Sequence, residues 1–504
     1  MSTFINIIEG HLPALIIVVF LLMSFITPIF DIWKRNWCSY LALFAHFVAL
    51  GFIGFLTWKV HNEGTISYHL GGWPPPWGIE FVVDYLAIFM MITVGVVSTL
   101  ILLFATEDVK HELKDKVSGW YYTLYLLLIA SLMGLAVTND FFNMFVFMEI
   151  GAISACGIIS IKEDRACIEA SLKYLILSSV GTGCVLLSSA LLYMITGHLN
   201  FSFAAAGLET AMYIYPNNVL VALALFSAGL IVKAALFPLH VWLPDAHSSA
   251  PSPSSAVLSG LVIKLYAVVY IKLLMKVFPA EIFTWVPVLE IILILSSLSI
   301  FFGSIFAMVQ DDIKRMLAFS SIAQIGYVFL GIGLYNHTGL SGGILHIFNH
   351  AMMKSMLFLS AGAIIYMTGI RKIDDLKGIG FKVPVAMGAF TVGAMAMVGI
   401  PSTNGFISKL HLALGSLEAG KPIYLYVILL SSFLNAVYYF PIVINAFFGE
   451  GGDEASMEAE EGDHKPLPLR MSVPLILLAL GCMFFGVFPR DILALIERAI
   501  GLLL

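Results

Sequence analysis

Charged side chains are scarce in this 504-residue sequence. Asp, Glu, Lys and Arg make up 12% of it and hydrophobic residues 60%, and the mean hydropathy is +0.95. This combination excludes a soluble globule and predicts a protein that crosses a membrane many times. The net charge of −6 identifies no partner, because acids and bases occupy mostly separate short loops. We expect the chain to lie in a lipid bilayer and to bind no nucleic acid.

Cysteines are few and nucleotide motifs are missing. The five cysteines are scattered, with no CxxC pair and no ligand-like spacing, at Cys38, Cys156, Cys167, Cys184 and Cys482. We therefore expect no iron–sulfur, zinc or disulfide framework. Neither a GxGxxG nor a P-loop pattern occurs, so no nucleotide site is visible. We expect no cofactor, no metal centre and no intrinsic redox chemistry, so an enzymatic role would come only through a partner, as in an ion-translocating oxidoreductase.

Long apolar runs, in contrast, are abundant. Runs of roughly 20 residues, enough to cross a bilayer core of about 30 Å, recur along the whole chain. By this length rule we count about fourteen, at residues 12–30, 38–58, 82–105, 119–138, 140–161, 174–196, 218–237, 253–275, 285–308, 316–335, 341–368, 384–418, 423–448 and 471–488. The first run has no basic leading region and no small-residue cleavage site, so we interpret it as a retained helix and not as a signal peptide.

Basic residues indicate the orientation. With the N-terminus outside, the inside loops hold Lys34, Arg35, Lys110, Lys114, Lys116, Lys162, Arg165, Lys173, Lys314, Arg315, Arg371, Lys372, Lys377, Lys382, Lys465 and Arg470. The outside segments hold only Lys59, Lys276, Lys421, Arg490 and Arg498. This asymmetry follows the positive-inside rule and requires an even number of spans. We therefore predict a multi-pass protein of the cell (inner) membrane with both termini on the outer side.

The two ends of the chain flank a longer central region. Residues 1–118 predict about three helices plus polar loops, of which the Gly-, Pro- and Trp-rich loop 69–85 should cap the outer surface. Residues 449–504 comprise an acidic, Gly-rich linker that we expect to be flexible, a last transmembrane helix and an amphipathic piece at 489–504. Within the central region, residues 199–216 are too short and polar to span, and should lie along the outer face.

The central region divides into two blocks of about five helices each, at 119–276 and 285–448. Each contains an interrupted helix: LIVKAALFPLHVWLPDAHSSAPSPSS (230–255) in the first and VGIPSTNGFISKLH (398–411) in the second. Because each block has an odd number of helices, the second must be inverted relative to the first. Paired Pro/Gly-interrupted helices in inverted repeats point to an ion path at the membrane midplane, since non-helical backbone survives there only where protein or water satisfies it.

Few ionisable groups remain at membrane depth once loop residues are removed. They are Glu149, Lys233, Lys264, His346, His350, Lys354 and Lys409. Asp84, Glu290 and Lys272 lie near helix ends, and we expect Lys272 to extend outward. One charge at the bilayer centre costs about 2.5–3.5 kcal/mol. Five charged residues at this depth are therefore hard to explain as packing accidents.

Each of these groups has a structural and a functional interpretation. Glu149 and Lys233 could be a static ion pair, or a pair whose geometry switches the protonation of a desolvated lysine. Lys264, on the next helix, could reach a backbone carbonyl or receive a proton from Lys233.

Four histidines extend the same pattern. His346 and His350 fall with Lys354 at i, i+4 and i+8 on one helix face, which favours a proton-conducting line over packing. His240 and His247, in or beside the first interruption, could feed this line from inside or make simple loop hydrogen bonds. Together these groups predict proton transfer along the midplane.

Several long motifs make the chain resemble a known family. FNMFVFMEIGAIS, VKAALFPLHVWLPDAHSSAPSPSSAVLSGLVIK, LAFSSIAQIGYVFLGIG and HIFNHAMMKSMLFLSAGAI occur in order over roughly 80–490. They look like the antiporter-type membrane subunits of respiratory complex I, of Mrp cation/proton antiporters and of membrane-bound hydrogenases. GGWPPPWGIEFVVDYLA and a lysine at Lys409 make the chain most similar to the D-type Mrp subunit and its hydrogenase equivalent.

The resemblance implies a fold, partners and residue roles. The fold is an all-α polytopic membrane protein with about 14 transmembrane helices and two inverted five-helix repeats, each with a broken helix. Glu149 would pair with Lys233, Lys264 would pass the proton inward, His346 and His350 would carry it, and Lys409 would control the exit. One complex I subtype has a glutamate at this last position, and the largest antiporter-like subunit has a long lateral helix after the fourteenth span, so we expect neither.

The leading hypothesis is a proton-translocating, antiporter-like subunit of a multisubunit membrane complex. In an Mrp setting proton entry would drive cation export, with Na⁺ expected, whereas in a hydrogenase or complex I-like NADH dehydrogenase setting a partner's electron transfer would drive pumping. Other membrane subunits are the implied partners. A stand-alone solute transporter with broken helices is a second hypothesis, although its site would usually carry Asp or aromatic groups rather than lysines. A purely structural scaffold is a third, and it explains five buried charges poorly.

Overall fold

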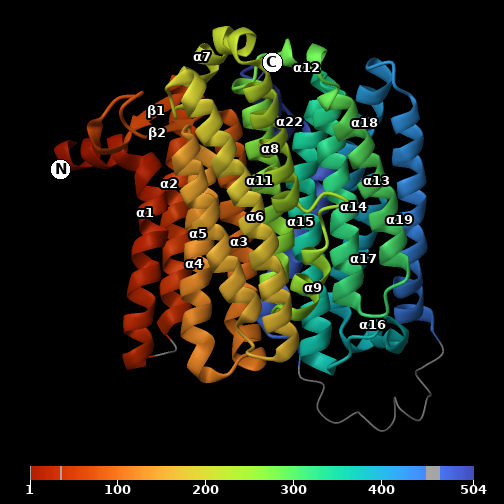
Figure 1. Cartoon of the computed structure of the whole chain (residues 1–504). Helices are drawn as coiled ribbons and strands as arrows, with labels where there is room; N and C mark the ends of the chain where they lie inside the picture. The colour runs from red at the N-terminus through yellow and green to blue at the C-terminus, as the bar shows by residue number, and fades with distance from the viewer. Residues whose placement is uncertain (1, 35–36, 450–465, 504) are drawn as a thin grey trace, which may run out of the picture.

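The computed structural model describes residues 2–34, 37–449 and 466–503, with side chains from residue 9 onward except at position 34. Its helices form a single bundle and run mostly along one axis (Figure 1). Thirteen helices in the described ranges are long and apolar enough to cross a membrane. The remaining predicted span, 384–418, is a pair of shorter helices, Pro384–Val398 and Asn404–Glu418. The predicted fold class is confirmed, including the interruption of the span at 384–418.

The first three long helices are joined to a small hairpin. They are α1 (Ser2–Lys34), α2 (Trp37–Glu63) and α3 (Tyr85–Glu112), and the hairpin strands are β1 (Ile66–His69) and β2 (Glu80–Val83). The strands pair antiparallel, with Ile66 opposite Val83. Phe81 and Val83 of β2 are buried, so alternate side chains attach the hairpin to the bundle. Sequence analysis predicted only a loop here, because strands of four residues give a weak periodic signal.

The first block contains four long helices and one short helix before its interruption. These are α4 (Asp115–Val137), α5 (Phe141–Ser160), α6 (Arg165–Thr196) and α8 (Pro216–Ala234), with the short α7 (Phe201–Ile214) between the last two. Side-chain caps begin α5 and α6: Asp140 accepts from the backbone N–H of Asn143 and Asp164 from that of Cys167, both at 2.8 Å. Helix α7 lies across one end of the bundle (Figure 1), as predicted for 199–216.

The first interruption follows α8. Ala235 has a left-handed backbone with φ of +56° and ends the helix. The chain then continues through α9 (Trp242–Ser249) and the last span of the block, made of α10 (Ser252–Val257), the π-helical η2 (Leu258–Val262) and α11 (Ile263–Lys276). Pro238, Pro244 and Pro251 fall in or beside the irregular backbone, where a missing N–H is tolerated.

The second block has a similar succession of helices, which run through the bundle in the opposite direction. Its members are α12 (Ile282–Trp285), α13 (Val288–Met308), α14 (Ile313–Leu334), α15 (His337–Thr368), η3 (Ile373–Leu376), α16 (Ile379–Lys382), α17 (Pro384–Val398), α18 (Asn404–Glu418) and α19 (Ile423–Phe448). From α8 to α9 the chain descends in Figure 1, whereas from α17 to α18 it ascends. The two interrupted elements are therefore antiparallel, as inverted repeats require.

Glycine is needed at the second interruption. Gly399 ends α17 with φ of +88°, a conformation that side chains rarely adopt. A Cβ atom on Gly405 would lie 1.9 Å from the carbonyl oxygen of Ala396, so α18 can begin beside the end of α17 only with a glycine there. The Pro/Gly pattern of the sequence thus corresponds to a real backbone constraint.

Two helices follow the second block: α21 (Leu469–Val487) and α22 (Arg490–Ile500). Most of the predicted acidic linker, 450–465, lies outside the described residues. Both ends of the described chain reach the hairpin end of the bundle, since His11 of α1 contacts the Tyr68 hydroxyl at 2.9 Å and Arg498 of α22 contacts His61 at 3.0 Å. This agrees with an even number of crossings; which side of the membrane they face stays a prediction.

Candidate functional site

Lys233 is buried in the last turn of α8, directly before the first interruption. Its side chain is 2% exposed, and its Nζ donates to the Ser178 hydroxyl of α6 at 2.5 Å. The same Nζ lies 5.5 Å from the centre of the Tyr266 ring, which stabilises a cation over its face. Neutral oxygen and an aromatic ring therefore hold this lysine.

Glu149 and Lys233 are not in contact in this conformation. Glu149 lies on α5 with its Oε1 buried and without a hydrogen-bond partner, and no ion pair within 4.0 Å joins it to Lys233, whose ammonium bonds to Ser178 instead. The carboxylate still acts electrostatically on Lys233, Tyr174 and Tyr266. The implied pair therefore occupies one shared environment in an open arrangement, and its closure stays a prediction.

Lys264 is fully buried at the start of α11 and donates its Nζ to the carbonyl oxygen of Ser259. Ser259 belongs to the π-helical turn, and such turns free carbonyls from the ordinary i→i−4 ladder. In this conformation the structural interpretation of Lys264, a lysine reaching a backbone carbonyl, holds. The Ser259 hydroxyl lies 2.8 Å from the Ser321 hydroxyl of α14. The two blocks are therefore in contact beside Lys264.

Two histidine rings near Lys264 have no hydrogen-bond partner. His247 of α9 and His350 of α15 are both 0% exposed, and all four ring nitrogens lack a partner. Lys264 and Lys354 act electrostatically on both rings. Burying four unsatisfied polar atoms is costly, and bridging water would satisfy them. The rings thus have unused capacity to accept and pass protons.

His346 connects three helices beside His350. The two rings are nearly parallel, at 17°, with centroids 5.7 Å apart. His346 contacts the Ser408 hydroxyl of α18 through Nδ1 at 2.9 Å and Oε1 of Gln324 on α14 through Nε2 at 3.0 Å. His346 and His350 therefore lie side by side on α15, and His346 is attached to the second interrupted element through Ser408.

Lys354 lies one turn further along α15. It is fully buried and donates to the Leu317 carbonyl at 2.7 Å, to the Ser320 hydroxyl, and to the Tyr439 hydroxyl at 3.4 Å. Because Ser320 also contacts the Tyr439 hydroxyl at 3.0 Å, a connected group of hydroxyls leads from Lys354 to α19.

Lys409 lies at the second interruption, in α18. Its Nζ donates to the carbonyls of Met397 at 2.8 Å and Val398 at 3.1 Å, and to the Ser432 hydroxyl at 3.1 Å. These carbonyls belong to the last turn of α17, where the helix dipole favours a cation. The Tyr327 ring lies 5.0 Å away. Lys233 comes before the first interruption in the chain, whereas Lys409 comes after the second. Both lysines lie beside an interruption, but on opposite sides of it in the sequence.

Two residues behave differently from the expectation. Lys272 does not extend outward: it is 5% exposed and donates to the Ala136 carbonyl of α4, because α4 and α7 pack against α11. His240 is 8% exposed and stacks on Phe237, with ring centres 5.2 Å apart. Its Nδ1 has no partner, and the structure does not place it against the buried line.

Sequence analysis assigned Lys314 to an inside loop and did not single out Asp108, yet both are buried. Lys314 is 1% exposed at the start of α14 and donates to the Ala250 carbonyl between α9 and α10. Asp108 is 3% exposed near the end of α3. Hydropathy ends a span where polar residues begin, so it cannot show that neighbouring helices still cover those residues. The short spacing of Asp108 and Glu112 on one helix face was the available signal.

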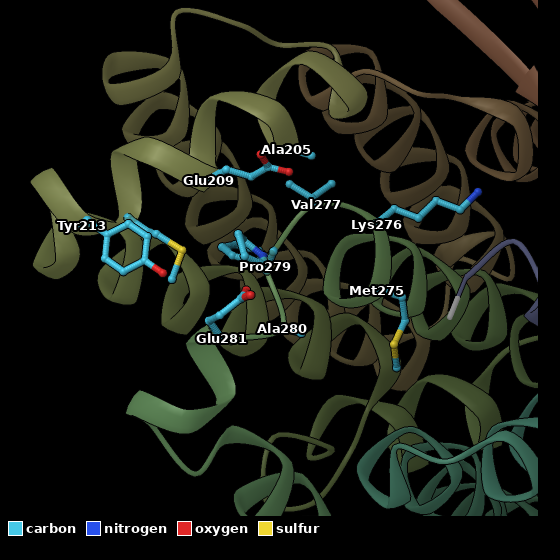
Figure 2. A pocket seen from close by; sticks show the side chains of 11 residues that line it. Ala205, Glu209, Tyr213, Met275, Lys276, Val277, Pro279, Ala280 and Glu281 are labelled. Carbon is cyan, nitrogen blue, oxygen red and sulfur yellow. The ribbon is translucent and has the colours of Figure 1, made fainter.

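A cavity of about 520 Å³ lies between α7 and the α11–α12 connection, at the other end of the bundle from Lys314 and Asp108. In Figure 2, Glu209 and Glu281 line it while Lys276 extends away from them. The Lys276 ammonium lies 2.6 Å from Oδ2 of Asp84, the residue that caps α3. Burial tends to raise the pKa of Asp84, but Lys272, Lys276 and the Ala87 N–H together lower the pKa below its usual value. None of the predicted site residues lines this cavity.

Comparison with known proteins agrees with this arrangement. The family described as NADH:quinone oxidoreductase/Mrp antiporter, TM, matches residues 138–435, which include both interrupted elements. The chain belongs to this family. It is 38% identical over 433 residues to NADH-quinone oxidoreductase subunit N of Desulforudis audaxviator, over 85% of each chain. It is 32% identical over 400 residues to the D-type subunit of the Na(+)/H(+) antiporter of Alkalihalophilus pseudofirmus, over 79% of each chain.

A solved relative shares the fold over nearly the whole length. A chain of the membrane-bound sulfane sulfur reductase, an archaeal respiratory membrane complex, superimposes with a TM-score of 0.88 at 31% identity, covering 97% of this chain and 96% of that one. The protein is therefore an antiporter-like, multi-span membrane subunit, as the resemblance implied. Its relatives are divided between respiratory and antiporter complexes, so membership alone does not assign the driving reaction.

Proposed function

We propose that this chain translocates protons along the buried line of Glu149, Lys233, Lys264, His247, His350, His346, Lys354 and Lys409, as one subunit of a multisubunit membrane complex. One observation carries the proposal. Four lysines of this line are at least 95% buried, and every hydrogen bond that they make is to a neutral oxygen. Within the described residues none of the four has an ion-pair partner within 4.0 Å.

This lack of fixed counter-charges is what proton transfer needs. A buried lysine without a carboxylate loses its proton readily, because desolvation disfavours the charged form. A permanently paired lysine would be locked in one state. Among the described residues, Glu149 is the carboxylate within electrostatic range of Lys233, and it can change the balance by approaching or withdrawing. Protonation can therefore follow conformation.

For the setting, we propose Na⁺/H⁺ antiport of the Mrp type, in which protons entering through this line drive Na⁺ export by the assembled complex. The 32% identity to the D-type subunit of an antiporter supports this setting. A redox-driven complex is the second candidate, and the higher identity to a quinone oxidoreductase subunit and the near-complete match to a respiratory complex chain favour it. In both settings the same residues move protons, and only the partner chains differ.

Isolation of the complex through a tag on this chain tests the proposal. Mass spectrometry of the co-purifying chains separates the settings: small Mrp-type membrane proteins indicate antiport, and iron–sulfur or nickel–iron proteins indicate redox drive. The complex is then placed in liposomes with a pH-sensitive dye, and proton movement is measured with a Na⁺ gradient or with the electron donor of the partner chains. Absence of proton movement under both conditions would refute the proposed function.

A further inference from the structure

Two carboxyl groups meet near the lower end of α3, outside the line described above. Asp108 and Glu112 are four residues apart and share one helix face. Both residues line the same cavity, and Asp108 Oδ2 is buried without a hydrogen-bond partner. Two adjacent carboxylates cannot both stay ionised cheaply. A proton shared between them would remove the repulsion and satisfy the orphaned oxygen.

The pair is reached from a cavity of about 230 Å³. Asp108, His111, Glu112, Ser252 and Tyr366 are among its lining residues, and the volume is enough for several water molecules. His111 is exposed and lies against the Tyr366 ring, with centroids 4.6 Å apart. The nearly fully buried Asp108 therefore faces a space through which protons can arrive.

Cations balance the pair from two other elements. Lys162, in the turn after α5, forms an ion pair with Glu112, and Lys314 of α14 acts electrostatically on both carboxyls. Tyr121 of α4 also faces them, and His111 and Tyr366 face them across the cavity. Glu112 also accepts from the Ser252 N–H at 3.3 Å, so the pair is attached directly to the start of α10.

The pair is adjacent to the buried line. Lys314 donates to the Ala250 carbonyl, which follows α9 directly, and it acts electrostatically on His247. The carbonyl of His247 accepts from the Ser255 hydroxyl at 2.7 Å, three residues beyond Ser252. A path that starts at the cavity therefore passes the carboxyl pair first, then Lys314, then His247, and leads towards Lys264.

We propose that Asp108 and Glu112 form a proton-loading site, which takes a proton from water in the cavity and delivers it towards His247. In the loading step a carboxyl O–H bond forms and water is left as hydroxide; in the delivery step that bond breaks and an imidazole N–H bond forms. Lys314 is a positioning residue, whose charge keeps the pair at one proton. The inference rests on the proposed function.

Infrared difference spectroscopy of the purified complex tests the shared proton without measuring transport. The wild type should show the carbonyl stretch of a protonated carboxyl at neutral pH, and the band should shift in D₂O. Asp108→Asn and Glu112→Gln should each remove it, because the remaining carboxylate is balanced by the two lysines. Glu107→Gln is the matched control: Glu107 lies on the same helix, contacts Arg470 at 3.1 Å and should leave the band unchanged.

Flux measurements on the same samples test the loading role. Asp108→Asn should slow proton flux at least about tenfold near neutral pH, with the defect shrinking as pH falls, because protons from bulk water replace the lost site. Asp108→Glu should restore both band and flux. If Asp108→Asn does not assemble on a native gel, Glu112→Gln carries the same expectations.

Three results would overturn the inference. A band that survives both substitutions shows that the pair holds no proton. A lost band with wild-type flux shows that the proton is not on the path. A wild-type complex without proton flux refutes the proposed function itself, and the loading role with it.

Discussion

The Lys409 Nζ lies 2.8 Å from the carbonyl oxygen of Met397, so the lysine of α18 caps the helix that ends before it. This contact alone could be structural, since a cation at a helix C-terminus is stabilising by about 0.3–1 kcal/mol at exposed sites. Proton transfer requires more, namely a charge that can be removed. Arginine and lysine separate the two roles, because arginine stays protonated at any workable pH.

Lys409→Arg should therefore block transport while preserving assembly. We expect flux to fall at least about tenfold, equivalent to about 1.4 kcal/mol, and Lys409→Ala to do the same. The measurement is ion flux through the assembled complex, with assembly verified on a native gel. Lys421→Arg, at an exposed pair with Glu290, is the control and should be silent. Wild-type flux in an assembled Lys409→Arg complex would remove Lys409 from the path.

Glu149→Ala should abolish transport without unfolding the protein. Removing one member of a contacting buried pair typically costs about 3–5 kcal/mol, but Lys233 donates to Ser178 and not to Glu149, so we expect a smaller loss of stability. Thermal unfolding of the purified complex measures stability, and flux measures function. Near wild-type exchange in Glu149→Ala complexes would show that the carboxylate only packs.

Gly405→Ala should destabilise the second interruption. The added methyl would lie 1.9 Å from the Ala396 carbonyl oxygen, so α17 and α18 must separate, and we expect a cost of about 1–3 kcal/mol together with loss of flux. Gly388→Ala in α17 is the matched control, because a Cβ there meets nothing within 4 Å. Equal unfolding temperatures for the two variants would contradict the close approach.

Asp84 should make stability depend on pH. The pKa of Asp84 is lowered in the folded state, so its stabilisation is fully present above the ordinary aspartate pKa of about 3.9 and is lost as the pH falls through the lower folded value. Asp84→Asn, which can still cap α3, should lower the free energy of unfolding by about 1–3 kcal/mol at neutral pH. Unfolding temperatures of the two proteins should converge on acidification. Glu290→Gln serves as the exposed control, and a difference independent of pH would refute the role of the charge.

The isolated chain should be nearly inert. It has neither a nucleotide motif nor a metal-ligand pattern in its sequence to supply a driving reaction. Purified protein in liposomes, given a pH gradient and Na⁺, should therefore exchange few ions, and addition of the partner chains should restore exchange. Robust antiport by this chain alone would contradict the multisubunit proposal.

Much of this architecture could be predicted from the sequence, because the bilayer imposes strong local rules. A helix must be about 20 apolar residues long to span, so hydropathy located the helices. Proline and glycine clustered within an apolar run indicate irregular backbone, so both interruptions were found. A charge at membrane depth is expensive, so Lys233, Lys264, Lys354 and Lys409 were recognised inside apolar runs.

Tertiary packing decided what those rules do not reach. Lys314, Asp108 and Lys272 lie near helix ends, where sequence cannot show whether neighbouring helices cover a residue or leave it in water. The sequence placed Glu149 and Lys233 in the interior, and the structure agrees. The packing of α5, α6 and α8 decided that the Lys233 ammonium donates to Ser178 and not to Glu149. Hydropathy is a property of one segment, whereas burial and pairing depend on which segments meet, and this is set by the packing of helices distant in the chain.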